Sequence, residues 1–289
     1  MLTGVWVPLV TPFRDGAVDL PSYRGLIEHY IGQGASGLFP LGTTGEAPTL
    51  DDDEEDAIVA ETVAAVAGRV PVFVGIGDNA TAKVIKTIKR LGRHEFPGIV
   101  SICPYYNRPT QAGMREHFTA IAEATARQIL IYNIPYRTSV NLTNETLLRL
   151  AELPNVVGVK DSSGSISQSL DLLATRPAGF SVLTGDDALF FPLLCSGADG
   201  GILASAHVAT DRFVDIAQRV ASNDHLGARA IWEPLWRFIP RLFEEANPMP
   251  IKHCLWRQGL IASPECRLPL TSVSGELSGI LDRLLGDFA

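Results

Sequence analysis

The chain has 289 residues, of which 46% are hydrophobic and 19% charged, a balance typical of a globular protein with a sizeable core. Its 24 basic and 32 acidic side chains give a net charge of −8, which argues against a nucleic-acid-binding surface. No apolar run approaches the ~20 residues that cross a bilayer and no secretory signal is visible, so we expect a cytoplasmic protein without membrane contact.

Short apolar strands alternate with amphipathic helices along most of the chain. β-Branched apolar runs that end at glycine, proline or polar residues predict strands, and apolar residues at helical spacing predict helices. Strands are expected at residues 4–10, 37–41, 70–75, 98–103, 128–132, 181–184 and 200–203, with a further strand that ends at Lys160. Helices are expected at residues 20–33, 81–93, 111–126, 144–153, 166–174 and 188–196, and in a segment opened by the acidic run 51–56.

Eight strand–helix units in a row predict a parallel sheet, and eight strands close a barrel. We therefore predict a (β/α)8 TIM barrel over residues 1–206, with a doubly wound open sheet as the alternative architecture. The number of units and the location of the unusual polar residues favour the barrel. In residues 207–289 the expected helices 208–221, 225–244 and 250–259 follow one another without a strand. They predict a C-terminal helical appendage that packs on the barrel through Trp232, Trp236, Phe238 and Trp256.

The polar residues that interrupt the apolar pattern follow the carboxyl ends of strands. In a barrel these ends meet on one face, where barrel enzymes carry out their chemistry. The residues in question are Thr43, Thr44, Tyr105, Tyr106, Tyr132, Arg137, Lys160, Gly185 and Asp186.

Lys160 is the strongest catalytic candidate, because it ends an apolar strand whose burial would favour a neutral, nucleophilic amine. Beside such an amine, the phenol of Tyr132 suits a proton relay, and the hydroxyls of Thr43 and Thr44 could pass protons to it. The guanidinium of Arg137 suits a carboxylate substrate. Each has a structural alternative: a snorkelling lysine, a strand-end aromatic, turn-capping threonines and a surface ion pair.

We expect neither a metal nor an organic cofactor. The sequence Gly75-Ile76-Gly77 matches only a fragment of a dinucleotide-binding fingerprint, and no His, Cys or carboxylate group has metal-ligand spacing. The cysteines lack a disulfide pattern and are expected to be reduced core thiols. They are Cys103, Cys195, Cys254 and Cys266.

Six motifs together resemble the dihydrodipicolinate synthase/N-acetylneuraminate lyase family of pyruvate-dependent class I aldolases, over residues 4 to about 274. They are Gly42-Thr43-Thr44-Gly45-Glu46, Pro104-Tyr105-Tyr106-Asn107-Arg108-Pro109, Tyr132-Asn133-Ile134-Pro135-Tyr136-Arg137-Thr138, Gly158-Val159-Lys160, Gly185-Asp186-Asp187 and Asn247-Pro248-Met249-Pro250-Ile251-Lys252. The resemblance implies an imine between Lys160 and pyruvate, with Tyr132 as proton relay. It also implies a homotetramer, a dimer of dimers, in which Tyr106 reaches a neighbouring subunit's site.

The same resemblance implies that Thr43 and Thr44 bind the pyruvate carboxylate, that Arg137 holds the carboxylate of the aldehyde substrate, and that Gly185 and Ile202 contact substrate. The motifs are most similar to those of the synthase branch, which condenses pyruvate with L-aspartate 4-semialdehyde in lysine biosynthesis. The alternatives are an aldolase or dehydratase for a 2-keto-3-deoxy sugar acid or 4-hydroxy-2-oxoglutarate, and a catalytically silent oxo-acid sensor.

Three departures from the synthase pattern bear on substrate and regulation. Ser139 stands where synthases usually have glycine, and Asp161-Ser162-Ser163 follows the lysine in place of Glu-Ala. Both could alter the pocket for the second substrate. Lys83 stands where lysine-inhibited synthases have glutamate, and its positive charge predicts little inhibition by L-lysine.

Overall fold

The computed structural model describes residues 1–286 of the chain, which form two compact units. The central unit consists of residues 1–3 and 73–202, and the terminal unit of residues 4–72 and 203–286. Within the described residues, no helix has the length and apolar character needed to cross a membrane.

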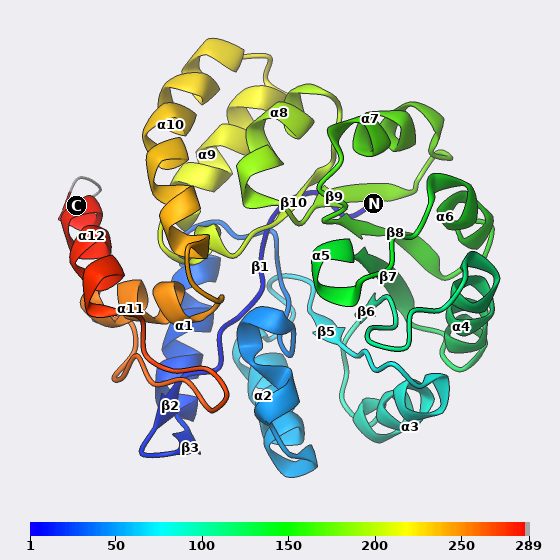
Figure 1. Ribbon diagram of the computed structural model, residues 1–289, viewed down its shortest axis with the longest axis horizontal. Helices are drawn as coiled ribbons and strands as arrows, with labels where there is room; N and C mark the ends of the chain where they lie inside the picture. Colours follow the sequence, from blue (N-terminus) through cyan, green and yellow to red (C-terminus); the bar gives the residue numbers. More distant parts are fainter. Residues whose placement is uncertain (287–289) are drawn as a thin grey trace. The chain divides into compact units, whose positions relative to one another are not determined.

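The central unit contains six parallel strands, each hydrogen-bonded to the next one in the sequence (Figure 1). They are β5 (Phe73–Gly75), β6 (Gly98–Ile102), β7 (Gln128–Asn133), β8 (Val156–Asp161), β9 (Ser181–Thr184) and β10 (Gly200–Ile202). The helices that connect them are α3 (Thr81–Leu91), α4 (Gln111–Glu123), α5 (Pro135–Thr138), α6 (Asn144–Leu150), α7 (Ile166–Thr175), η3 (Asp187–Leu189) and α8 (Phe190–Cys195).

Buried β-branched and apolar residues form the core of β7, where Ile129, Leu130 and Ile131 are fully buried. Strand β8 approaches β9 closely at Gly158, since a Cβ atom there would lie 2.3 Å from the carbonyl oxygen of Ser181. Gly158 and Ser181 are partners in the register of these two parallel strands.

The terminal unit contains the parallel strands β1 (Gly4–Val7) and β4 (Gly37–Leu38) and the antiparallel hairpin of β2 (Phe13–Arg14) and β3 (Ala17–Val18). Its N-terminal helices are α1 (Leu20–Gly32), η1 (Thr43–Gly45), η2 (Ala47–Thr49) and α2 (Asp52–Val66). Its C-terminal helices are η4 (Ser205–His207), α9 (Thr210–Ala221), α10 (His225–Phe238), η5 (Ile239–Phe243), α11 (Met249–Arg257) and α12 (Gly275–Gly286).

The acidic run of α2 is a helix start, as predicted. The side chain of Asp51 accepts a hydrogen bond from the N–H of Glu54, and the Glu54 side chain accepts one from the N–H of Asp51. This reciprocal capping box satisfies two backbone donors that the first helical turn leaves unpaired.

The alternation of eight parallel strands with helices confirms the predicted (β/α)8 class, and a helical segment follows the last strand as predicted. Most predicted elements are one to four residues longer than the observed ones. The hairpin β2–β3, the short α5 and the last helix α12 were not predicted. Each hairpin strand has two residues, too few to show a periodicity of two.

Two aromatic side chains of the appendage are not buried as predicted. Trp232 and Phe238 are buried, but Trp236 is 50% and Trp256 40% exposed. The buried face of α10 follows the spacing of Ala228, Trp232 and Leu235, and Trp236 is rotated by about 100° from Leu235 toward solvent.

The prediction that all cysteines are core thiols is also wrong. Cys103 and Cys254 are buried, whereas Cys195 is exposed and Cys266 is half-buried. Cys195 ends α8, a helix that buries Leu193 and Leu194 instead.

His207 in η4 is a fully buried histidine held in its neutral form. Its Nε2 accepts the N–H of Val10 at 3.2 Å, and its Nδ1–H donates to the carbonyl oxygen of Ala204 at 2.8 Å. Burial lowers the pKa of His207 to about 4. The folded state therefore keeps His207 deprotonated at pH values where the same side chain binds a proton in the unfolded chain, in which it titrates near pH 6.5.

We expect the unfolding free energy to fall as the pH is lowered from 6.5 to about 4, because the unfolded state binds the His207 proton first. The contribution of His207 to this loss is about 3 kcal/mol. Urea unfolding of the wild type and of His207→Gln across this range checks it, since the variant should show a smaller pH slope. Equal slopes would contradict the assignment.

Candidate active site

Lys160 lies near the carboxyl end of β8 and is only 6% exposed. It is paired in register with Tyr132 on β7, and paired residues of neighbouring strands project to the same side. The Nζ of Lys160 lies 4.2 Å from the centre of the Tyr132 ring. The two residues ranked first by sequence therefore contact each other.

Burial lowers the pKa of Lys160 to about 7. The negative charge of Asp187 opposes this shift, and the positive charge of Arg137 adds to it. A substantial fraction of Lys160 is consequently a neutral amine near pH 7, the protonation state that attacks a carbonyl carbon.

Gly185, directly after β9, gives the lysine side chain its space. A Cβ atom at this position would lie 2.7 Å from Cε and 2.9 Å from Cγ of Lys160, and 2.3 Å from Oγ of Ser162. Any larger residue would displace the lysine stem. The predicted role of Gly185 in the site thus has a steric basis, and buried Ser162 lies beside it.

Tyr132 is 6% exposed, and burial raises the pKa of its phenol well above the usual range. The nearby Tyr136 raises this pKa further, whereas the Arg137 guanidinium lowers it. The phenol remains protonated at neutral pH and can donate a proton to, or pass one from, a group bound at Lys160.

Arg137 is exposed and lies in the short helix α5, which follows β7 after one intervening residue. Its Nε donates to the hydroxyl of Tyr136 at 3.2 Å, and its guanidinium carbon lies 5.2 Å from the centre of that ring. Ser139 caps the carboxyl end of this helix and adopts the left-handed conformation with φ 62°. A glycine adopts this conformation without steric cost, so serine is tolerated here at the expense of some strain.

Tyr106 lies in the loop after β6 and is 88% exposed. It has a φ of 72° and Arg108 one of 49°, so two non-glycine residues adopt the left-handed conformation close together. Asn107 between them fixes the loop, because its Nδ2 donates to the carbonyl oxygen of Asn79 at 2.7 Å. The loop presents the Tyr106 ring to solvent.

Thr43 and Thr44 belong to the terminal unit, where they form η1 with Gly45. Thr44 is 4% exposed, and its Oγ1 accepts a hydrogen bond from Nδ2 of Asn247 at 2.9 Å. Because this bond uses an acceptor position, the hydroxyl proton of Thr44 stays available for another partner. Ile202, the last residue of β10, is buried in the central unit.

A second buried lysine provides a contrast to Lys160. Lys252 in α11 is fully buried, and its Nζ donates to Glu46 and to the carbonyl oxygen of Glu265 at 2.8 Å. Burial lowers the pKa of Lys252 too, but the Glu46 carboxylate opposes this shift and holds the Lys252 nitrogen in an ion pair within the terminal unit.

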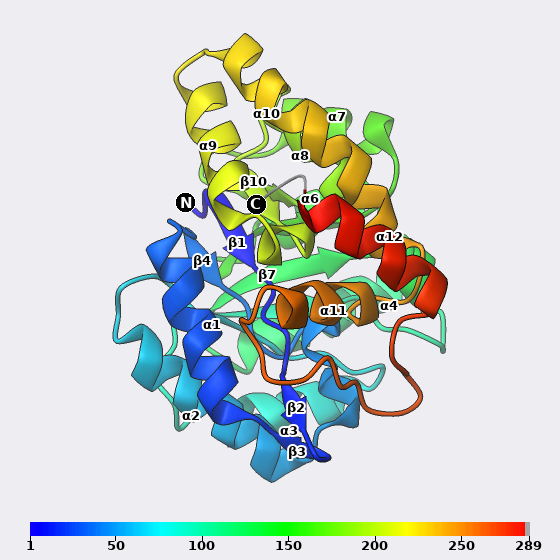
Figure 2. The same ribbon diagram turned by 90° about the vertical axis from the view of Figure 1, so that its left-hand side faces the viewer.

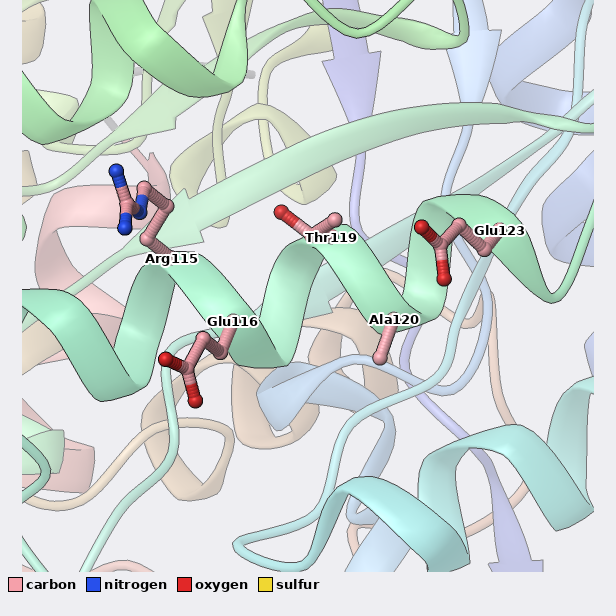
Figure 3. A pocket seen from close by; sticks show the side chains of 5 residues that line it. All are labelled: Arg115, Glu116, Thr119, Ala120 and Glu123. Atoms are coloured by element: carbon pink, nitrogen blue, oxygen red, sulfur yellow. The ribbon is translucent and has the colours of Figure 1, made fainter.

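A surface hollow of about 440 Å³ lies along α4, and none of the residues described above lines it (Figure 3). It is lined by Arg115, Glu116, Thr119, Ala120 and Glu123. All five belong to the helix α4, and none lies directly at the carboxyl end of a strand of the sheet. The hollow is therefore not the candidate site.

Sequence reasoning did not name Asp187, Ser162 and Asn247 as site residues. Asp187 is 5% exposed, and its charge acts on Lys160 and Tyr132. The motif that contains it, Gly185-Asp186-Asp187, was the available signal, but sequence alone did not distinguish its two carboxylates.

The model of the dihydrodipicolinate synthetase family matches residues 1–286. A protein of Clostridium acetobutylicum named 4-hydroxy-tetrahydrodipicolinate synthase 2 is 49% identical, over 98% of this chain and 99% of its own length. A 4-hydroxy-tetrahydrodipicolinate synthase of Nitrosomonas europaea is 40% identical over 99% and 98%. The solved structure of a dihydrodipicolinate synthase from Thermotoga maritima is similar with a TM-score of 0.97 and 37% identity, covering 99% and 98% of the two chains.

Proposed function

The chain belongs to the dihydrodipicolinate synthetase family, and we propose that it is a 4-hydroxy-tetrahydrodipicolinate synthase that condenses pyruvate with L-aspartate 4-semialdehyde. The observation that carries the chemistry is the buried Lys160 amine, with its lowered pKa, against the Tyr132 ring. A neutral amine is the nucleophile that imine formation from a ketone requires, and a protonated phenol beside it can transfer the protons of the reaction.

The first half of the reaction takes place on pyruvate. The Lys160 nitrogen attacks the ketone carbon, and loss of water from the carbinolamine gives a protonated imine. The imine draws electrons from the neighbouring methyl group, so that a methyl proton leaves through Tyr132 and an enamine forms. The hydroxyls of Thr43 and Thr44 hold the pyruvate carboxylate and extend the proton relay.

The second half joins the two substrates. The enamine carbon adds to the aldehyde carbon, and the aldehyde oxygen takes a proton from the relay. Arg137 pairs with the carboxylate of the aldehyde substrate. The exposed position of Arg137 in α5, just after β7, suits this role. The amine of the joined product then attacks the imine carbon, closes the ring and displaces Lys160.

A condensation assay with pyruvate and a panel of aldehydes tests this function. We expect turnover with aspartate semialdehyde to exceed that with sugar-derived aldehydes and glyoxylate. Preference for one of the latter would instead assign the chain to the aldolases of the same family. Binding of pyruvate without turnover of any aldehyde would indicate an oxo-acid sensor.

We expect kcat/KM for pyruvate to rise with pH up to an inflection near 7, by about tenfold per pH unit below it, because only the neutral amine attacks. The variant Asp187→Asn should move the inflection to lower pH, since Asp187 raises the pKa of Lys160. An inflection unchanged in the variant, or a rate that is flat with pH, would contradict the role of Lys160.

The oligomer proposed here is a homotetramer of two dimers, and the 88% exposure of Tyr106 in a strained loop supports a role in a neighbouring subunit. Tyr106→Phe should lower turnover, and mixing it with Lys160→Ala should restore activity. Random exchange makes half of the dimers mixed with one complete site in each, so about a quarter of wild-type activity is expected. Mixtures as inactive as their components would show that Tyr106 does not act in a neighbour's site.

A further inference from the structure

We propose that the buried ion pair of Glu46 and Lys252 positions the segment Thr43–Gly45. In this way the ion pair sets the affinity for pyruvate, although the pair itself does not contact pyruvate. The inference rests on the proposed function, in which Thr43 and Thr44 hold the pyruvate carboxylate. It concerns the terminal unit alone, which contains every residue of the argument.

The pair is completely enclosed. Lys252 is fully buried and Glu46 is 3% exposed. The Nζ of Lys252 donates to Oε1 of Glu46 and to the carbonyl oxygen of Glu265, and it lies 4.2 Å from the centre of the Phe13 ring. The other carboxylate oxygen, Oε2, accepts the N–H of Arg267 at 2.9 Å. Both charges therefore have partners within hydrogen-bond distance.

Glu46 is also the point at which the backbone reverses. With φ 53° and ψ 32° it adopts the left-handed conformation, and it both ends η1 and precedes η2. Its N–H donates to the carbonyl oxygen of Thr43 at 3.1 Å, and its own carbonyl oxygen accepts the N–H and the hydroxyl of Thr49. A non-glycine residue persists in this conformation only when its surroundings hold it there.

The segment 247–252 binds the loop of residues 43–46 at two points. Asn247, just before α11, donates to the hydroxyl of Thr44, and Lys252, within α11, binds Glu46. Between these two points, the hydroxyl of Thr11 donates to the carbonyl oxygen of Gly45 at 2.7 Å. Figure 2 shows the chain between α11 and α12, which supplies Glu265 and Arg267, running beside the hairpin β2–β3.

A charged pair enforces one arrangement of the loop more strictly than an apolar contact would. If Glu46 left its place, Lys252 would remain as a buried ammonium without its carboxylate, which is strongly unfavourable. An apolar pair of equal volume tolerates small shifts of the backbone. The pair thus selects the backbone at Glu46 that orients Thr43 and Thr44.

The test compares the single variant Lys252→Met with the double variant Glu46→Gln/Lys252→Met. The single variant leaves a buried carboxylate and is expected to be destabilised, whereas the double variant is neutral and regains stability. In the folded double variant we expect the KM for pyruvate to rise by about tenfold to 100-fold, the scale for misplacing a binding group. The KM for the aldehyde and the pH inflection near 7 should stay unchanged.

Tyr23→Phe is the matched control, because it removes another buried hydrogen bond of the terminal unit, from the Tyr23 hydroxyl to that of Thr62 at 2.8 Å. It should lower stability and leave the KM for pyruvate unchanged. If the KM for pyruvate rose equally in the control, a general loss of stability in the terminal unit would explain the effect, and not the positioning of Thr43 and Thr44. A double variant with the pyruvate KM of the wild type would overturn the proposal.

Borohydride trapping separates this outcome from failure of the proposed function. If the wild type with pyruvate is not labelled at Lys160, the proposed function fails. If the wild type is labelled, and the double variant is labelled with the same dependence on pyruvate concentration, only the positioning role fails.

Discussion

Replacing Lys160 by alanine is expected to lower kcat for condensation by about 10⁴-fold or more, the scale for loss of a covalent nucleophile. Lys160→Arg should be equally inactive, although it keeps the positive charge, because a guanidinium does not lose its proton in the working pH range. Steady-state assays of both variants at saturating pyruvate check this expectation.

The covalent step is visible directly by mass spectrometry. Wild-type protein treated with pyruvate and borohydride should gain the mass of one reduced pyruvate unit on the peptide that contains Lys160. The peptide of Lys252 serves as the internal control, because its ammonium is bonded to Glu46 in a fully buried ion pair. Labelling at Lys252, or an unlabelled protein, would refute the assigned nucleophile.

Tyr132→Phe is expected to lower turnover by about 10²-fold or more, the usual effect of losing a positioned acid or base. The substitution keeps the aromatic ring 4.2 Å from the Lys160 nitrogen and removes only the hydroxyl. Imine formation and enamine formation can be distinguished by exchange of the pyruvate methyl protons with deuterated water. This exchange should slow in parallel with turnover.

The pH inflection assigned to Lys160 is the control for Tyr132→Phe. If the inflection stays near 7 while methyl exchange slows, the phenol acts in proton transfer and not by tuning the amine. Wild-type exchange and turnover in the variant would mean that the Tyr132 ring is a packing element.

The strands that carry the site could be predicted because the signals for them lie in neighbouring residues of each strand. A β-branched run that ends in a lysine predicts both a buried strand and a costly charge at its end, and β8 with Lys160 fits both. The parallel alternation predicted that Tyr132 and Lys160 would lie close together, and the strand register pairs them.

Features that depend on partners far away in the chain could not be predicted from the local sequence pattern. The burial of Glu46 depends on Lys252 and on the backbone of Arg267, more than 200 positions away. The exposure of Trp236 depends on which face of α10 finds a partner, and composition does not specify that face. The left-handed backbone at Ser139 was likewise invisible, since serine gives no conformational signal of the kind that glycine gives.

The two units differ in how their sequences are arranged, and this determines the order in which they can be completed during synthesis. Residues 73–202 of the central unit leave the ribosome as one continuous stretch, with Tyr132 and Lys160 inside it. The terminal unit is interrupted, so Glu46 is translated early and Lys252 only after the whole central stretch. A nascent chain therefore holds Tyr132 and Lys160 before it can close the ion pair behind Thr43 and Thr44.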